Sequence, residues 1–352
     1  MHCPNCNMEI PKEAKFCPNC GFNFKNKIQS AGNVIISPEI NVSPVISVGG
    51  EGAQVKNINR EDQKRPLSDS LEILEKIRNE TLKKSAENVQ RYCQRLLDAF
   101  YASDDIYFRF FTNHASLHSQ TILKILKELL FELKLKNDYE YYLLYIAAYA
   151  HDIGMLPQKT NGGYEDYAKQ EVVEEARKEH SVRSAEHIKK NWRELGILEK
   201  THSVHLAEIC KAHSSKVDIN KVPERAECVI DGEKVEIRWR FLAALIRLAD
   251  ALDADYNRIP PEFIIKDAKL SEKTVREYLK HECVQKVTVS HRDRKIYVDL
   301  LLPEEGAMHE IKEDLKKHLV DEFESVKAII NGYGVRIEKI EFLETAGSGM
   351  FR

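Results

Sequence analysis

Residues 147–157 read AAYAHDIGMLP, and the interpretation of the whole chain starts from them. The run that leads into them, YYLLYIAAYA (141–150), is apolar on nearly every face, so we predict a central, buried helix there. His151 and Asp152 stand side by side at its end, and Gly154 is suited to terminating it. A buried carboxylate is costly without a partner, and a divalent cation would resolve this cost for both side chains.

The composition is that of an ordinary globular protein. The chain has 352 residues, 43% of them hydrophobic, with a formal net charge of −3. This length predicts two or three structural units. The balanced charge argues against an obligate, wholly electrostatic DNA binder. The longest apolar run covers only about half of a membrane span, so we expect no membrane contact. Since no targeting segment is visible, we predict a cytoplasmic protein with reduced cysteines.

Four of the cysteines form two CPNC knuckles near the N-terminus, with the spacing C-x2-C-x10-C-x2-C: Cys3, Cys6, Cys17 and Cys20. Four thiolates in this arrangement suit the tetrahedral coordination of Zn²⁺, and so short a segment needs the metal to fold. The doubled spacing argues against a redox pair or disulfides. We therefore predict a zinc ribbon at 1–25, which resembles the short ribbons at the start of many prokaryotic proteins. Whether it contacts nucleic acid or protein stays open.

Residues 26–65 form a strand-rich linker in this interpretation. The stretch NVIISPEINVSPVISVGG (33–50) is too rich in β-branched residues for typical disorder, and unpaired it would be a sticky edge. We expect residues 33–48 to pair between subunits at or near an interface, which predicts a homo-oligomer of at least two chains. The alternative is a disordered tether that leaves the ribbon free to search for nucleic acid.

Helical periodicity dominates residues 66–260. Apolar residues recur three and four apart, with Ser68 a candidate N-cap of the first helix, and we predict helices at 68–100, 116–136, 139–152, 176–195, 202–214 and 240–256. One β-interruption stands out at 226–239, where Asp231-Gly232 between alternating segments predicts a hairpin with a type I′ turn.

Residues 261–352 read as an α+β subdomain. We predict strands at 282–291, 295–303 and 335–344, and a long helix at 310–331 that is ended by Gly332. The predicted fold class is therefore mainly α, with an N-terminal zinc ribbon and a C-terminal α+β subdomain.

Ligand-type residues lie on three of the apolar helices. His118 opens one helix, His151 and Asp152 end the next, and Asp250 lies in the apolar run LAALIRLADALDADY (242–256). Imidazole and carboxylate together suit Mn, Fe, Zn, Ni or Co, whereas Mg²⁺ prefers a shell richer in oxygen.

The order HSQTIL, AHDIG, LADALD resembles the HD-domain metal-dependent phosphohydrolases, whose ligand order is H…HD…D. The resemblance covers roughly residues 68–260 and implies His118, His151, Asp152 and Asp250 as metal ligands. His114, four residues before His118, is then a neighbour of the ligands or a substrate contact.

Two more histidines lie in the interval between the HD pair and the last aspartate. Some HD branches, including the HD-GYP phosphodiesterases, carry two added histidines there that bind a second metal, and His180 and His213 match their order, although no GYP signature follows. In mononuclear branches such histidines contact phosphate or donate a proton. The number of divalent metals in this site, one or two, therefore stays open. We place the other histidines nearby, His187, His202 and His205, on the surface.

The resemblance implies hydrolysis of a nucleotide, an NTP, dNTP or NMP, by a metal-bound hydroxide that attacks phosphorus, with Asp152 orienting it. Arg247, three residues before Asp250, and Arg258 are candidate phosphate clamps. Residues 160–170 are a candidate lid. The alternatives are a cyclic or oligonucleotide phosphodiesterase, or a non-catalytic nucleotide sensor that binds nucleic acid. The layout is also similar to HD proteins of prokaryotic antiphage systems.

Overall fold

The computed structural model of the chain describes residues 43–45, 56–58, 68–103, 112, 114–131, 133–160, 163–167, 169–259, 272–302 and 308–346. The cysteines of the predicted ribbon and most of the linker lie outside the described residues. Within the linker, β1 (Ser43–Val45) and β2 (Lys56–Ile58) pair antiparallel with each other. Ser43–Val45 thus has a partner strand in its own chain, and pairing between subunits at 33–48 stays a prediction.

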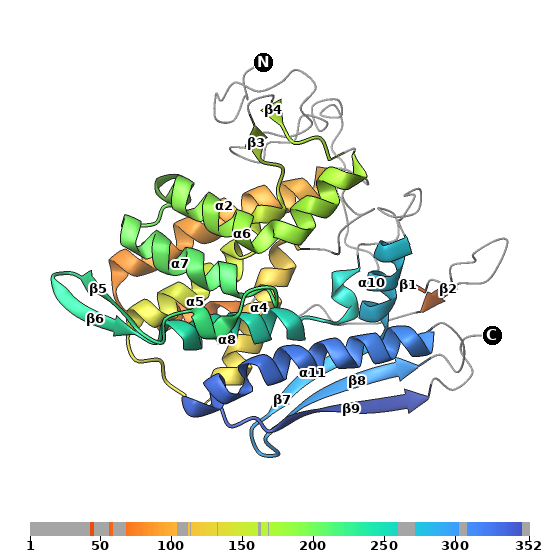
Figure 1. The fold of residues 1–352 in the computed structure, drawn as a ribbon. Coiled ribbons are helices and arrows are strands. Elements are labelled where there is room, and N and C mark those ends of the chain that lie inside the picture. Colours follow the sequence, from red (N-terminus) through yellow and green to blue (C-terminus); the bar gives the residue numbers. More distant parts are fainter. Residues whose placement is uncertain are drawn as a thin grey trace, which may run out of the picture.

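Helices build the middle of the chain, as predicted (Figure 1). They are α1 (Ser68–Glu75), α2 (Glu80–Ser103), α4 (Ser116–Leu130), α5 (Asp138–Ala150), α6 (Gln170–Leu195), α7 (Lys200–Ala212) and α8 (Trp239–Leu252). The predicted central helix is α5: every residue from 142 to 150 is buried, and the helix packs against α2, α4, α7 and α8. This burial on all sides explains why the sequence of α5 is apolar on nearly every face.

The single helix predicted at 68–100 is divided, which corrects that prediction. Backbone N–H groups of Arg78 and Asn79 donate to Oδ2 of Asp138, at 2.6 and 2.7 Å, and so leave the helical pattern. The side chain of Asn79 then accepts from the N–H of Leu82 at 3.0 Å, which caps the start of α2. Asp138, at the start of α5, therefore interrupts the helix between α1 and α2, although the apolar periodicity of the sequence continues through the interruption.

The hairpin predicted around Asp231-Gly232 is confirmed. Strands β5 (Ala226–Ile230) and β6 (Glu233–Ile237) pair antiparallel, with Ile230 opposite Glu233. Asp231 and Gly232 both have positive φ, 51° and 84°, as a type I′ turn requires.

The C-terminal part is α+β, as predicted. It contains α10 (Glu272–Cys283), β7 (Val284–Ser290), β8 (Lys295–Leu302), α11 (Met308–Gly332) and β9 (Lys339–Ala346). Strands β8 and β9 are parallel, and α11 supplies the crossover between them. Figure 1 shows α11 between α8 and this sheet, and both parts contribute to one apolar core. The sequence pattern does not predict helix α10, because this helix runs into β7 without a turn residue.

Among the described residues, no helix combines the length and the apolar character that crossing a membrane requires.

Two histidines expected on the surface are instead buried, which corrects their interpretation. His202 and His205 on α7 are 2% and 5% exposed, and His187 is half-buried. The ring of His202 packs against that of Tyr139, with centroids 4.7 Å apart. Neither ring nitrogen of His202 has a hydrogen-bond partner within the described part of the chain. Burial lowers the pKa of His202 to about 4.

Replacing His202 with leucine is expected to make the fold less sensitive to acid. The unfolded chain protonates this ring near pH 6.5, whereas the folded chain resists protonation until about pH 4. The stability that the neutral ring contributes is therefore complete above pH 6.5. It is lost as the pH falls towards 4, by on the order of 2–3 kcal/mol.

Urea unfolding of both proteins at pH 7.5 and pH 4.5 measures this difference. The free energy of unfolding should fall less for His202→Leu than for the original chain between these two pH values. Equal losses in the two proteins would show that His202 already binds its proton in the folded state.

Candidate metal centre

The end of α5 carries the two side chains on which the predicted site is centred. His151 is the C-cap residue of α5, and Asp152 follows it, just before the short 3-10 helix η2 (Ile153–Met155). The two residues are only 1% and 2% exposed, because α5 runs through the middle of the helical bundle. Polar groups in such apolar surroundings need polar partners.

The first ligand group consists of His118, His151, Asp152 and Asp250, one ligand atom of each lying within 4.8 Å of the others. They come from α4, the end of α5 and α8. Nε2 of His118 lies 3.0 Å from Nε2 of His151 and 3.2 Å from Oδ1 of Asp250. Oδ2 of Asp152 lies 3.0 Å from Nε2 of His151. The helical topology thus gathers the residues that the sequence spaces over more than a hundred positions.

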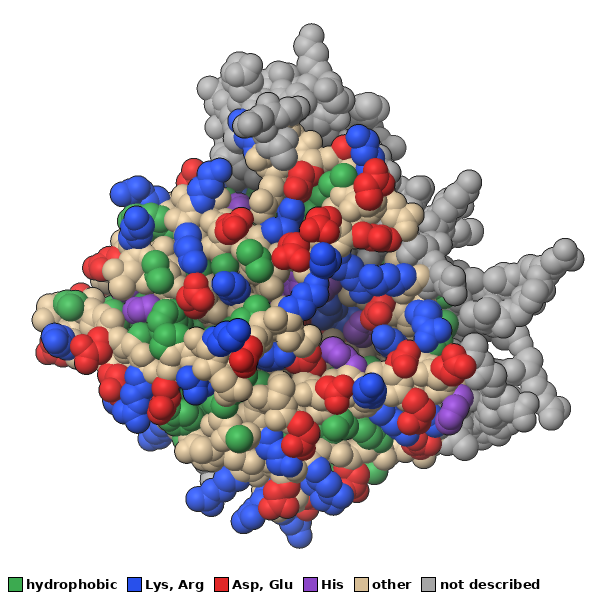
Figure 2. Space-filling view, viewed as in Figure 1, with side chains coloured by type: hydrophobic (Ala, Val, Ile, Leu, Met, Phe, Trp, Pro, Cys, Tyr) green, Lys and Arg blue, Asp and Glu red, His purple; other side chains and the backbone are tan. Residues whose placement is uncertain are grey.

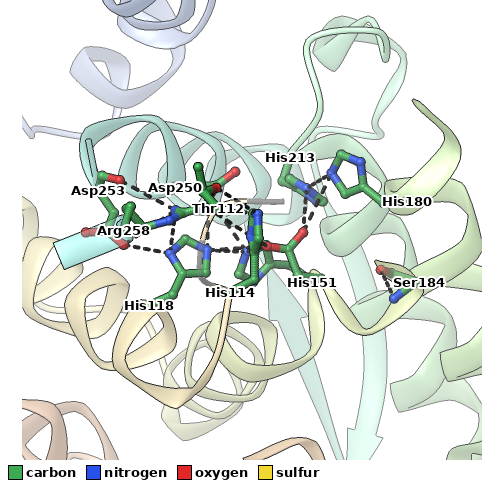
Figure 3. Close-up of polar contacts among 12 residues, drawn as sticks. Thr112, His114, His118, His151, His180, Ser184, His213, Asp250, Asp253 and Arg258 are labelled. Carbon is green, nitrogen blue, oxygen red and sulfur yellow. Dashed lines mark hydrogen bonds and ion pairs between the residues drawn. The ribbon is translucent and has the colours of Figure 1, made fainter. Parts of the chain in front are cut away.

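The second ligand group consists of Asp152, His180 on α6 and His213 after α7. Nε2 atoms of the two histidines are 2.8 Å apart, and each lies 3.6 Å from Oδ1 of Asp152. Asp152 therefore belongs to both groups, with one carboxylate oxygen facing each. Figure 3 shows His180 and His213 side by side, apart from His118.

Hydrogen bonds on the far side of the rings fix the tautomers of these histidines. Nδ1 of His151 and of His180 lie 3.2 and 2.7 Å from the carbonyls of Ala148 and Arg177, and Nδ1 of His213 contacts a carbonyl likewise. A carbonyl only accepts, so Nδ1 carries the proton and Nε2 of the neutral ring presents a lone pair. Lone pairs that converge at such short range repel each other unless a cation lies between them.

Comparison with known families agrees with this geometry. A model of the HD-CE family matches residues 108–324, which is more than half of the chain. The chain belongs to the HD-CE family. A zinc-ribbon domain model matches residues 2–24, so the N-terminal ribbon is confirmed as a domain and indicates zinc. A search of the curated proteins found no match. The HD-CE match spans every residue of both ligand groups, which is consistent with an HD-type metal-dependent hydrolase.

The spacing of the ligand atoms in the HD-CE domain suits a divalent cation. Ligands about 2.1 Å from one ion are roughly 3.0 Å apart in octahedral and roughly 3.4 Å apart in tetrahedral coordination. Most distances within the first group lie in this range, from 3.0 Å between Nε2 of His151 and Oδ2 of Asp152 to 3.4 Å between Nε2 of His118 and the same oxygen, and Nε2 of His151 lies slightly farther, 3.7 Å, from Oδ1 of Asp250. The side chains of Asp250 and His180 are 25% and 19% exposed, so both groups can be reached from solvent.

The electrostatics of the first group are those of carboxylates that face histidines. Burial lowers the pKa of His118, but hydrogen bonds to three aspartates outweigh burial and raise it to about 9. Burial also lowers the pKa of His151, but the carboxylates of Asp152 and Asp250 outweigh burial and raise this pKa to about 10. The facing histidines hold the pKa of both carboxyl groups well below the usual range, against the effect of burial. Protons and a metal therefore compete for the same nitrogens, and metal affinity should fall at low pH.

Asp253 holds the far side of His118, and sequence reasoning missed it. Its Oδ2 lies 2.6 Å from Nδ1 of His118, and Nη1 of Arg258 lies 3.5 Å from the same oxygen. This carboxylate accepts a hydrogen bond from Nδ1–H of His118, so that Nε2 presents its lone pair to a cation. The available signal was a second acidic residue, three positions after Asp250, directly after the same apolar helix.

His114 lies beside the candidate ligands, as predicted, and Arg258 lies next to it, while the role of Arg258 as a phosphate clamp stays a prediction. Nδ1 of His114 is 2.7 Å from Oδ2 of Asp152, close enough to donate a hydrogen bond to it. Nη2 of Arg258 lies 3.1 Å from Nε2 of the same ring, which can accept from it, and donates to Oγ1 of Thr112 at 3.2 Å. Burial and the charge of Arg258 lower the pKa of His114 to about 3. His114 thus supports the carboxylate that the two ligand groups share, and Arg258 holds the ring of His114.

Arg247 lies elsewhere, which corrects its interpretation as a phosphate clamp. Its Nε donates to Oε2 of Glu322 on α11 at 2.8 Å, and its Nη1 donates to the carbonyl of Val217 at 3.1 Å. The guanidinium is thus engaged at the packing of α8 against α11, and its hydrogen bonds go to Glu322 and Val217 rather than to either ligand group.

Replacing Asp253 with alanine is expected to weaken the first metal position selectively. The ring of His118 then loses the acceptor that fixes its tautomer, and loss of such a partner typically lowers metal affinity about 10- to 100-fold. Titration of the metal-free protein with Mn²⁺ measures this. The second position should be unchanged, because none of its ligands contacts Asp253. Equal weakening of both positions would contradict the assignment.

Proposed function

We propose that this protein is a metal-dependent phosphohydrolase that acts on nucleotides and uses two divalent ions. His118, His151 and Asp250 would hold the first ion, His180 and His213 the second, and Asp152 would contact both. The observation that carries the proposal is the placement of Asp152, whose two oxygens face separate histidine pairs. Divalent ions would lower the pKa of a bound water and neutralise charge on phosphate oxygens.

The chain's own residues prepare the site for this chemistry. The histidines are held by hydrogen bonds at Nδ1, so their ligand atoms are oriented before substrate arrives. His114 holds Asp152, and Arg258 adds positive charge beside His114. Figure 2 shows histidine side chains at a hollow near the middle of one face, with Lys and Arg side chains beside it. Positive charge at such a mouth favours an anionic substrate.

A second candidate is hydrolysis of a phosphodiester in a cyclic or short linear oligonucleotide. The two ligand groups favour it, because paired ions can stabilise both the attacking and the leaving oxygen of an in-line displacement. No described residue distinguishes a diester from an anhydride, so both substrate classes belong in the first experiment.

A screen of nucleotides with Mn²⁺, Mg²⁺ and Co²⁺ tests the proposal. We would incubate the full chain with NTPs, dNTPs, NMPs and cyclic or linear oligonucleotides, and identify phosphate, triphosphate, nucleoside or linear dinucleotide by chromatography. Turnover that requires metal, and is lost in Asp152→Asn, supports the proposal. Tight nucleotide binding without turnover under every metal would overturn it in favour of a nucleotide sensor.

A further inference from the structure

The loop that follows Asp152 lies directly against α6, and Gly154 makes the closest approach. A Cβ atom at this position would lie 2.2 Å from the carbonyl oxygen of His180 and 2.4 Å from the backbone nitrogen of Ser184. No real side chain tolerates such distances to backbone atoms, so only glycine allows this approach. The contact brings the backbone of His180, a residue of the second ligand group, against the loop that carries Asp152.

Two consecutive side chains of α6 hold the backbone of this glycine. Oγ of Ser184 accepts from the N–H of Gly154 at 2.8 Å, and Nε of Arg183 donates to its carbonyl at 2.8 Å. Nη2 of Arg183 also donates to the carbonyl of Leu156 at 3.0 Å, and the guanidinium pairs with Glu165. Ser184 is fully buried, so water cannot reach the N–H of Gly154 here, and the hydroxyl of Ser184 supplies the acceptor that this N–H needs.

Helical spacing connects these bonds to the second ligand group. Residues three and four positions after His180 lie on the same face of α6 as its ring. Ser184 and Arg183 occupy these positions, and Gly154 follows Asp152 by two residues. The bonds therefore span the two elements whose separation places Nε2 of His180 at 3.6 Å from Oδ1 of Asp152. Of the first ligand group, none comes from α6: its members lie on α4, after α5 and on α8.

We propose that Ser184 is a positioning residue for the second metal ion. Its hydroxyl oxygen, aided by Arg183, fixes the loop after Asp152 against α6 and so sets the distance between His180 and Asp152. The proposal rests on the two-ion site proposed above, and it predicts an effect on one ion alone.

Ser184→Ala should therefore lower affinity for the second ion about 10- to 100-fold and leave the first unchanged, as loss of such supporting bonds generally does. Ser203→Ala is the matched control. Ser203 is equally buried, but its hydroxyl donates within its own helix, to the carbonyl of Lys200 at 2.7 Å. Metal-free full-length proteins would be titrated with Mn²⁺ and followed by electron paramagnetic resonance, since paired Mn²⁺ ions give a spin-coupled spectrum and a single ion does not.

Two further variants keep the test decisive if Ser184→Ala folds poorly. Arg183→Lys retains the charge opposite Glu165 but lacks the planar set of nitrogens that reaches the carbonyls of Gly154 and Leu156 from Nε and Nη2, and should weaken the second ion in the same selective way. Gly154→Ala forces the loop away from α6 and should abolish the coupled spectrum while one ion remains.

The outcomes separate this proposal from the proposed function. Loss of the coupled spectrum in Ser184→Ala or Arg183→Lys, with Ser203→Ala unchanged, supports the positioning role. Two ions bound with unchanged affinity in both variants, or equal weakening of both ions, overturns it and leaves the two-ion site standing. An original chain that binds only one ion overturns both proposals, and absent turnover with two ions bound overturns only the function.

Discussion

Replacing Asp152 with asparagine is expected to empty both metal positions at once. Asparagine presents one carbonyl oxygen and one NH₂ group, so it can face only one ligand group with a lone pair, and it carries no charge to balance a cation. In the original chain the two oxygens lie 3.0 Å from Nε2 of His151 and 3.6 Å from that of His180. If the proposed hydrolysis is correct, kcat/KM should fall by at least about 10³-fold, since the ions supply several kcal/mol of barrier reduction.

Two single replacements serve as controls for this effect. Asp250→Asn changes a carboxylate whose Oδ1 lies near His118 and His151, and should weaken the first ion alone. His180→Ala removes a ligand of the second ion alone. Metal analysis after dialysis should therefore find about one ion fewer in each control, with the ribbon zinc retained throughout. An Asp152→Asn protein that keeps either core ion at full affinity would show that Asp152 is not shared.

The sequence is sufficient to locate the candidate ligands because their surroundings are unusually apolar. Residues 142–150 are buried on every face of α5, so the polar pair that follows contrasts sharply with the residues around it. His118 and Asp250 contrast with their apolar neighbours in the same way. Spacing along the chain cannot show which oxygen of Asp152 faces which histidines. That depends on how α6 and α7 approach the end of α5, and such packing is set by three-dimensional contacts.

The wrong predictions share a cause. Arg247 lies three residues before Asp250, and helical geometry places such residues near each other, but the neighbour that each side chain meets depends on the packing of α11. The polarity of histidine predicts a surface position for His202 and His205, whereas the aromatic rings around them provide a buried setting. The division between α1 and α2 depends on Asp138, about sixty residues away in sequence.

Replacing Arg247 with alanine is expected to destabilise the fold by about 3–5 kcal/mol, because it leaves the carboxylate of Glu322 buried without its partner. Arg247 and Glu322 are 4% and 6% exposed, and their bond joins α8 to α11. Urea unfolding measures the free energy. Arg276→Ala is the matched control, since Arg276 pairs with Asp314 of the same helix α11 but both side chains are exposed. This change should cost no more than about 1 kcal/mol.

The double replacement Arg247→Met with Glu322→Leu tests the cause of that loss. It removes both charges and keeps apolar volume between α8 and α11, so most of the stability should return, as buried ion pairs exchanged for apolar residues often show. Metal content should match the original chain in all these proteins, because Arg247 contacts no ligand. A phosphate clamp would behave in the opposite way: the single replacement would keep its stability and lose turnover, and the double replacement would not restore it. We would therefore measure stability and turnover of the original chain, of Arg247→Ala and of the double variant. These measurements decide whether Arg247 links α8 to α11 or binds the phosphate of the substrate.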